Sequence, residues 1–135
     1  MAAGHEIGCH GWTHEDLATL SPAAERDVMA RSVEAVTRVS GIRPRGFRAP
    51  YWSLSDRTLD LAVELGFAYD SSLMADDVRL YRVRRGDVQD RVASRFGAPG
   101  QLVEVPIGWA LDDWPHFEPG AKAVGPMSAA SKVEE

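Results

Sequence analysis

The feature that most constrains the fold is the alternation of helical segments with short apolar strands. The first helix is predicted over residues 21–41, where Ser21 can cap the helix and Pro22 suits its first position. Gly41 follows the last helical residue, where glycine is the usual C-terminal cap. Apolar residues inside this segment recur at helical spacing and predict one buried face: Val28, Met29, Val33, Val36 and Val39.

A second, shorter helix is predicted from Ser53 to Gly66. Ser53 and Asp56 have the spacing of a capping box, in which each side chain bonds the backbone of the other. Gly66 would end the helix. Its inward-facing residues are expected to be Leu59, Ala62, Val63 and Leu65.

Short strands are predicted around these helices. Residues 1–10 read as a strand that enters a glycine-rich loop, residues 67–70 as a strand, and residues 102–107 as another. Pro106 indicates that the last is an edge strand or ends there. Strands that alternate with helices of about 15 residues predict an α/β fold with parallel strands.

Four polar residues follow predicted strands: His10, Arg48, Asp70 and Asp112. Arg48 begins a strand end or loop, because the residue before Pro50 is pushed away from helical backbone. In parallel α/β folds, functional groups gather at the carboxyl ends of the strands. We therefore expect these four residues to share one site.

Three of the four histidines fall in the segment HEIGCHGWTHED, residues 5–16. His10 and His14 are four residues apart, so one helical turn between them would put both imidazoles on one face. Two such rings can bind one divalent ion, for which zinc is the common choice. The spacing alone fits two ordinary loop histidines as well, and a catalytic zinc needs a third protein ligand from another strand end.

Composition narrows the class of protein. The chain has 135 residues, a net charge of −5 and 44% hydrophobic residues, which indicates one ordinary globular domain. The basic residues are scattered apart from one cluster, read as a solvated face, and nucleic acid is not expected as a partner. That cluster consists of Arg79, Arg82, Arg84 and Arg85. Cys9 is the only cysteine, and no apolar run approaches a membrane span, so a cytoplasmic setting is expected.

Four segments in order resemble the motifs of one enzyme family. GHEIGCHGWTHE, residues 4–15, resembles the histidine motif of the polysaccharide deacetylases, the NodB-like domains of carbohydrate esterase family four. GFRAPYW at 46–52 is similar to the next motif, and YDSS at 69–72 to the strand end that follows. EVPIGWALDDWPHF at 104–117 resembles a segment of the peptidoglycan-deacetylase and cyclic-imide-hydrolase branch.

The resemblance implies a distorted (β/α) barrel that removes N-acetyl groups from amino sugars with a divalent metal, commonly zinc. By matching position, His10 and His14 are the histidine ligands, and Arg48 holds the catalytic aspartate. Tyr51 supplies a backbone N–H that helps bind the oxyanion. Aromatic and acidic positions near the substrate groove are Trp52, Asp112, Asp113 and Trp114.

Two departures from the family pattern stand out. Gly11 follows the first histidine where the family has Ser or Thr, so Thr13 is expected to supply the hydroxyl. The family's aspartate pair and its last histidine motif have no counterpart in residues 1–135. We therefore expect a single incomplete domain, a partial barrel, with little or no deacetylase activity as an isolated chain.

Three functions stay open on the sequence. The first is N-deacetylation of an amino-sugar polymer such as peptidoglycan or chitin, and the second is hydrolysis of a cyclic imide or ureide. The third is saccharide binding without turnover through Trp52, Trp109 and Trp114. Exposed edges of an incomplete barrel also make a homo-oligomer possible in principle.

Overall fold

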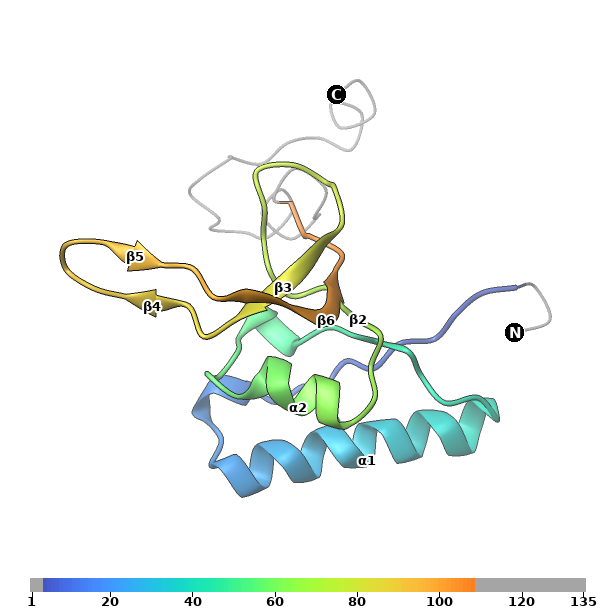
Figure 1. The fold of residues 1–135 in the computed structure, drawn as a ribbon. Coiled ribbons are helices and arrows are strands. Elements are labelled where there is room, and N and C mark those ends of the chain that lie inside the picture. The colour runs from blue at the N-terminus through green and yellow to red at the C-terminus, as the bar shows by residue number, and fades with distance from the viewer. Residues whose placement is uncertain (1–3, 109–135) are drawn as a thin grey trace, which may run out of the picture.

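A computed structural model describes residues 4–108, and it confirms the α/β class (Figure 1). Both helices lie on the same side of the strands, with α2 between α1 and the sheet. The elements in chain order are η1 (Leu17–Thr19), α1 (Pro22–Ser40), β1 (Gly46–Phe47), η2 (Pro50–Trp52), α2 (Thr58–Glu64), β2 (Tyr69–Asp70), β3 (Tyr81–Arg85), β4 (Val88–Gln89), β5 (Ser94–Arg95) and β6 (Ala98–Glu104).

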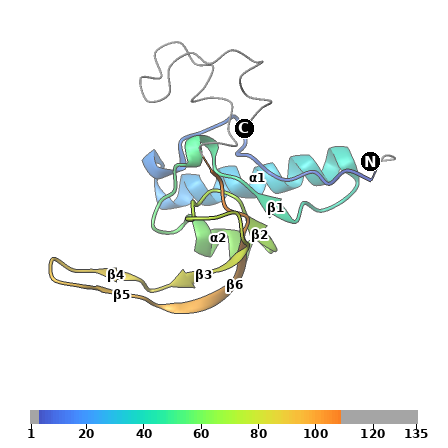
Figure 2. The same cartoon turned by 90° about the horizontal axis from the view of Figure 1, so that it is seen from above.

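The main sheet has the strand order β1-β2-β6-β3. β1, β2 and β6 run parallel, as expected, and β3 pairs antiparallel with β6. Of the strand expected at residues 1–10, the described part, residues 4–10, forms one parallel bridge, between Cys9 and Phe47. β4 and β5 form a separate two-stranded hairpin that projects from the body in both views (Figure 2).

Helix α1 follows its sequence signals closely. Ser21 is the N-cap, and its side chain accepts a hydrogen bond from the Ala24 N–H, a contact typically worth about 1 kcal/mol. Gly41 ends the helix in left-handed backbone with φ of 74°. Met29 and Val33 are buried, but Val39 is 85% exposed, so the expected apolar face ends before the last turn.

Helix α2 begins later than the sequence predicts. Residues 50–52 form a 3-10 turn, and the α-helix starts at Thr58 rather than at Ser53. The Ser55 N–H donates to the Thr58 side-chain oxygen, so the polar contact at this helix start is local. Both hydroxyls also donate to the Glu25 carboxylate on α1, a tertiary contact that no capping pattern encodes.

The position of β6 corrects one expectation and confirms another. β6 lies between β2 and β3, so it is not an edge strand of the described sheet. The strand ends at Glu104, before Pro106, as the proline predicts. The arginines at 82, 84 and 85 lie on β3, which pairs with β6.

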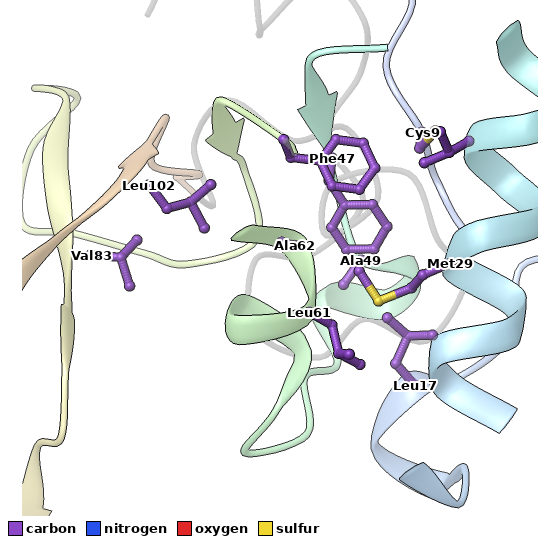
Figure 3. Packing of buried hydrophobic residues seen from close by; sticks show 11 residues of the cluster. Cys9, Leu17, Met29, Phe47, Ala49, Leu61, Ala62, Val83 and Leu102 are labelled. Carbon is purple, nitrogen blue, oxygen red and sulfur yellow. The ribbon is translucent and has the colours of Figure 1, made fainter. Parts of the chain in front are cut away.

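The hydrophobic core lies between α1, α2 and the sheet (Figure 3). Met29, Leu17 and Leu61 point toward one another, and all three are at most 1% exposed. Phe47 of β1 packs on Phe67, with 5.4 Å between ring centroids. Within the described chain, neither helix has the length and apolar character needed to cross a bilayer.

Candidate metal centre

His10 and His14 lie side by side, although not for the reason the spacing suggests. The segment between them is a loop, so the expected helical turn is wrong. His14 has left-handed backbone, with φ of 68°, and its ring lies against that of His10. The two ring centroids are 4.9 Å apart, with an edge-to-face angle of 73°. The rings share one exposed surface, as a pair of metal ligands requires.

The orientation of His10 is set by the backbone of Arg48. His10 Nδ1 lies 2.8 Å from the Arg48 carbonyl oxygen. A carbonyl can only accept, so Nδ1 must carry the proton, and the neutral ring then has its lone pair on Nε2. Metal-binding histidines usually donate their second ring N–H in this way. The Arg48 N–H in turn donates to the Cys9 carbonyl at 2.9 Å, which ties the histidine loop to the end of β1.

His14 contacts Tyr51 on the next loop. Their ring centroids are 4.6 Å apart, at an angle of 79°. Within residues 4–108, the non-glycine residues with positive φ are His14, Tyr51 and Trp52. Such backbone costs about 1–3 kcal/mol per residue and persists where the surroundings enforce it, often at functional sites. The strained positions of the described chain thus converge on the histidine pair.

Gly11 explains the departure from the family pattern. Its φ is 75°, and a Cβ built there would lie 2.9 Å from Cγ of Pro50 and 3.1 Å from a Glu15 oxygen. Serine or threonine would therefore meet both an unfavourable backbone and a steric clash. Glycine lets the histidine loop pack directly against the 50–52 turn.

Glu15 organises the loop between the histidines, a role that the sequence analysis missed. Its carboxylate accepts hydrogen bonds from the N–H groups of Trp12 and Thr13, each at 2.9 Å. The Thr13 hydroxyl also donates to it, at 2.8 Å, so this hydroxyl serves the loop. Partial burial acts to raise the pKa of Glu15, but these hydrogen bonds outweigh it and hold the pKa below its usual value.

The Arg48 guanidinium does not meet a carboxylate within residues 4–108. Its Nε donates to the Ser71 carbonyl at 2.8 Å, and its Nη2 donates to the Ser71 hydroxyl at 2.6 Å. Within residues 4–108, Arg48 therefore forms no surface ion pair. Ser71 follows β2, so the contact joins the carboxyl ends of β1 and β2.

Asp70 lies behind this contact and not in the open site. It is fully buried, and its carboxylate accepts from the Ser72 N–H at 3.0 Å and from the Ser72 hydroxyl at 2.9 Å. This matches the capping character of the Asp-Ser-Ser string, although no helix follows. Its neighbour across the sheet is Glu104, which is also fully buried. The sequence analysis missed Glu104. The available signal was an acidic residue between the apolar residues Val103 and Val105 of a predicted strand.

A hollow of about 480 Å³ adjoins His10. It is lined by His10 and Arg48, and by residues of the floor formed by β1 and β2. A larger hollow of about 650 Å³ lies between α2 and the β3–β6 pair, away from both histidines. The smaller hollow is the candidate site, because His10 and Arg48 both line it.

The two imidazoles suit a divalent metal, but they are not a complete site. Within residues 4–108, no group of three or more His, Cys, Asp or Glu side chains is arranged to hold a metal. Trp52 is half-buried and is itself part of the strained turn. The remaining predicted residues lie outside the described residues: Asp112, Asp113 and Trp114.

Comparisons with known proteins identify the family of this chain. The sequence profile of the polysaccharide deacetylase family matches residues 1–69, and the chain belongs to that family. Peptidoglycan deacetylase of Helicobacter pylori is 38% identical over 124 residues, which are 84% of this chain and 42% of that protein. A peptidoglycan deacetylase-like protein of Gibberella zeae is 34% identical over 82% of this chain and 36% of its own length. The chain thus spans less than half the length of these relatives.

Two solved structures are also similar. A Mycobacterium smegmatis protein assigned to the polysaccharide deacetylases superposes with a TM-score of 0.75 at 39% identity. The match covers 98% of this chain and 43% of that one. The allantoinase PuuE gives a TM-score of 0.62 at 28% identity, over 83% of this chain and 33% of its own. The resemblance to the deacetylase motifs is therefore confirmed at the level of the family.

Proposed function

We propose that the chain contributes to a metal-dependent hydrolase that removes N-acetyl groups from an amino-sugar polymer. The observation that carries the proposal is the His10–Arg48 hydrogen bond with the His14 ring alongside. This arrangement places two neighbouring imidazoles where both can bind one cation. The H. pylori relative, a peptidoglycan deacetylase, supports peptidoglycan as the polymer.

His10 and His14 would be the two histidine ligands, and zinc suits them because imidazole is among its preferred donors. When bound, the metal supplies Lewis-acid polarisation of the amide carbonyl and an acidified water. The third ligand would come from outside residues 4–108, as the family's aspartate motif implies. His10 is held ready for this role, since its Nδ1 is already occupied by the Arg48 carbonyl.

Arg48 and Tyr51 would complete the chemistry around the substrate amide. Ser71 anchors Nε and Nη2 of Arg48, and Nη1 has no partner among the described residues, so it can hold the carboxylate that acts as general base. Tyr51, whose ring lies against that of His14, would use its backbone N–H to stabilise the developing oxyanion. Trp52, Asp112, Asp113 and Trp114 would line the groove that receives the sugar.

Metal binding tests the ligand assignment directly. Isothermal titration with zinc should show one weak site per chain, lost in His10→Ala and in His14→Ala. His5→Ala is the matched control, because His5 is exposed and belongs to the same segment but not to the ring pair. Equal zinc affinity in all four proteins would refute the assignment.

Activity tests the reaction. Residues 1–135 alone are expected to release little or no acetate from peptidoglycan or chitooligosaccharides. In a protein that also carries the family's aspartate motif, acetate release is expected to depend on zinc and to fall at least about 100-fold in His10→Ala. Turnover that survives both the substitution and a chelator would count against the proposed reaction.

Hydrolysis of a cyclic ureide is a second candidate, favoured by the similarity to the PuuE allantoinase. Both reactions attack a carbonyl carbon bonded to nitrogen, so the same histidine pair could serve either. Parallel assays with allantoin, a cyclic imide and a chitooligosaccharide separate them. Ring opening without acetate release would favour this second candidate.

A further inference from the structure

Two acidic side chains face each other inside the molecule, behind the histidine site. Asp70 of β2 and Glu104 of β6 are register partners on neighbouring parallel strands, and both are 0% exposed. Register partners in a parallel sheet project from the same face about 4.8 Å apart. Within residues 4–108, no ion pair involves either carboxylate.

The hydrogen bonds of the pair are unequal. Both Asp70 oxygens accept from Ser72, and Glu104 Oε1 accepts from the Leu73 N–H at 3.0 Å. Glu104 Oε2 is buried and has no donor among the described residues. Two ionised carboxylates at this position would repel each other in a medium of low dielectric constant, and one oxygen would lack a partner.

A single proton resolves both difficulties. Placed on Glu104 Oε2, it removes one charge and turns the unpartnered acceptor into a donor aimed at Asp70. Burial, followed by the nearby Asp70 charge, raises the pKa of Glu104 to about 8. The same burial raises the pKa of Asp70. The contact is then a charge-assisted O–H···O⁻ hydrogen bond, which is stronger than a neutral one.

We propose that Asp70 and Glu104 share one proton and act as positioning residues for Arg48 and, through it, for His10. The inference rests on the proposed function only in the role given to His10. Neither acid would touch substrate. The pair instead fixes the turn at residues 71–73 by accepting hydrogen bonds from Ser72 and Leu73.

The chain of contacts from the pair to the histidine is continuous. Ser72 donates its hydroxyl to Asp70 and accepts from the Ala49 N–H at 2.8 Å. Ser71, the preceding residue, receives both guanidinium bonds of Arg48. The Arg48 carbonyl holds His10 Nδ1. Ionisation of the second acid would add a buried charge next to this turn. The added charge would weaken the hydrogen bonds that residues 48–49 donate to Ser71 and Ser72.

Tyr81 and Arg84 are further titratable groups near the pair. Tyr81 on β3 is the register partner of Glu104, and burial together with the two acids raises the pKa of its phenol. Its hydroxyl donates to the Met74 carbonyl, and Arg84 lies close enough to oppose that shift. Tyr81 therefore stays neutral while the pair loses its proton.

Carboxyl NMR on the full chain tests the shared proton. With ¹³C-labelled Asp and Glu side chains, we expect one carboxyl carbon to titrate near pH 8, far above the others. Glu104→Gln keeps an N–H donor for Asp70 and an acceptor for the Leu73 N–H, so it should fold and abolish that titration. If every carboxyl carbon completes its titration below pH 6, the proposal is wrong.

The ¹⁵N shifts of the His10 ring test the positioning role. At pH 7 the wild type and Glu104→Gln should both show the Nδ1–H tautomer. At pH 9.5 its population should fall at least twofold in the wild type but not in Glu104→Gln. Glu25→Gln, which removes another buried carboxylate, should behave as the wild type. Identical behaviour of the wild type and Glu104→Gln at pH 9.5 would overturn the positioning role.

These outcomes are independent of the proposed reaction. Failure of zinc binding with an intact titration near pH 8 would reject the metal assignment and leave the pair standing. Zinc binding without that titration would do the opposite.

Discussion

Glu25 and Glu104 are buried to the same degree, 1% and 0% exposed, but the structure accommodates them differently. Glu25 on α1 accepts hydrogen bonds from the hydroxyls of Ser55 and Thr58, so donors from one turn surround it. Glu104 faces another acid and has one oxygen without a donor in the described chain. The comparison shows that burial alone does not decide what a carboxylate does; the supply of donors does.

Stability as a function of pH gives the largest expected difference. The pKa of Glu104 is raised to about 8, so the folded state retains a proton that the unfolded state releases near pH 4.5. Between these values the unfolded chain binds fewer protons, and the free energy of unfolding therefore falls as pH rises. The loss reaches up to about 1.4 kcal/mol per pH unit between pH 5 and 8 and then stops.

Urea unfolding of the wild type and Glu104→Gln at half-unit pH steps measures this effect. The stability of the wild type relative to Glu104→Gln should decline across that window and level off above it. A difference that stays constant from pH 5 to 9 would contradict the assignment of the raised pKa to Glu104.

Glu25→Ala is expected to cost about 3 kcal/mol of unfolding free energy. The substitution leaves two hydroxyls near the start of α2 without their acceptor, and each unsatisfied buried group costs about 1–3 kcal/mol. Chemical denaturation at pH 7 provides the measurement. Glu34→Ala, on the exposed side of the same helix, should stay within about 0.5 kcal/mol of the wild type. Equal losses in the two variants would show that the hydroxyl contacts do not tie α1 to α2.

The same two regions show what the sequence could reveal. The caps of α1 are local, so Ser21 and Gly41 marked its ends correctly. The start of α2 depends on the hydroxyls of Ser55 and Thr58, which donate to Glu25 on α1. Because this contact joins segments far apart in the sequence, no local sequence pattern predicts it. Glu104 could not be paired with Asp70 without the β2–β6 register, which is a tertiary property.

The sequence predicted which residues lie together at the candidate site better than it predicted the backbone between them. Family motifs named His10, His14 and Arg48 together, and the structure brings them together. The helical turn assumed between the histidines is wrong, because the segment is a loop in which His14 has left-handed backbone. Glu15 was missed, since a carboxylate that folds back on the N–H groups of Trp12 and Thr13 has no periodic signal.

Gly11→Ala should cost about 2 kcal/mol, more than the matched substitution Gly41→Ala. Both glycines have φ near 75°, and left-handed backbone alone costs about 1–2 kcal/mol for other residues. Only Gly11 also brings a Cβ within 2.9 Å of Pro50, whereas the space around Gly41 is open. Thermal and urea unfolding of both variants measures the difference. Gly11→Ala should in addition weaken zinc binding, and equal effects of the two substitutions would remove the role given to the Pro50 contact.

Glu64→Gln should have the smallest effect, below about 0.5 kcal/mol. Glu64 pairs with Arg26 across the outer surface of α1 and α2, but both side chains are about half exposed, at 53% and 49%. Water competes for such a pair, and the entropy lost in holding two long side chains offsets most of the attraction. Urea unfolding at low salt and at 1 M salt provides the check, since screening should reduce even this small difference. A loss above 1 kcal/mol that persists in high salt would mean that an exposed acid can tie the helices together as firmly as Glu25, and the ranking of these carboxylates by their burial and donors would fail.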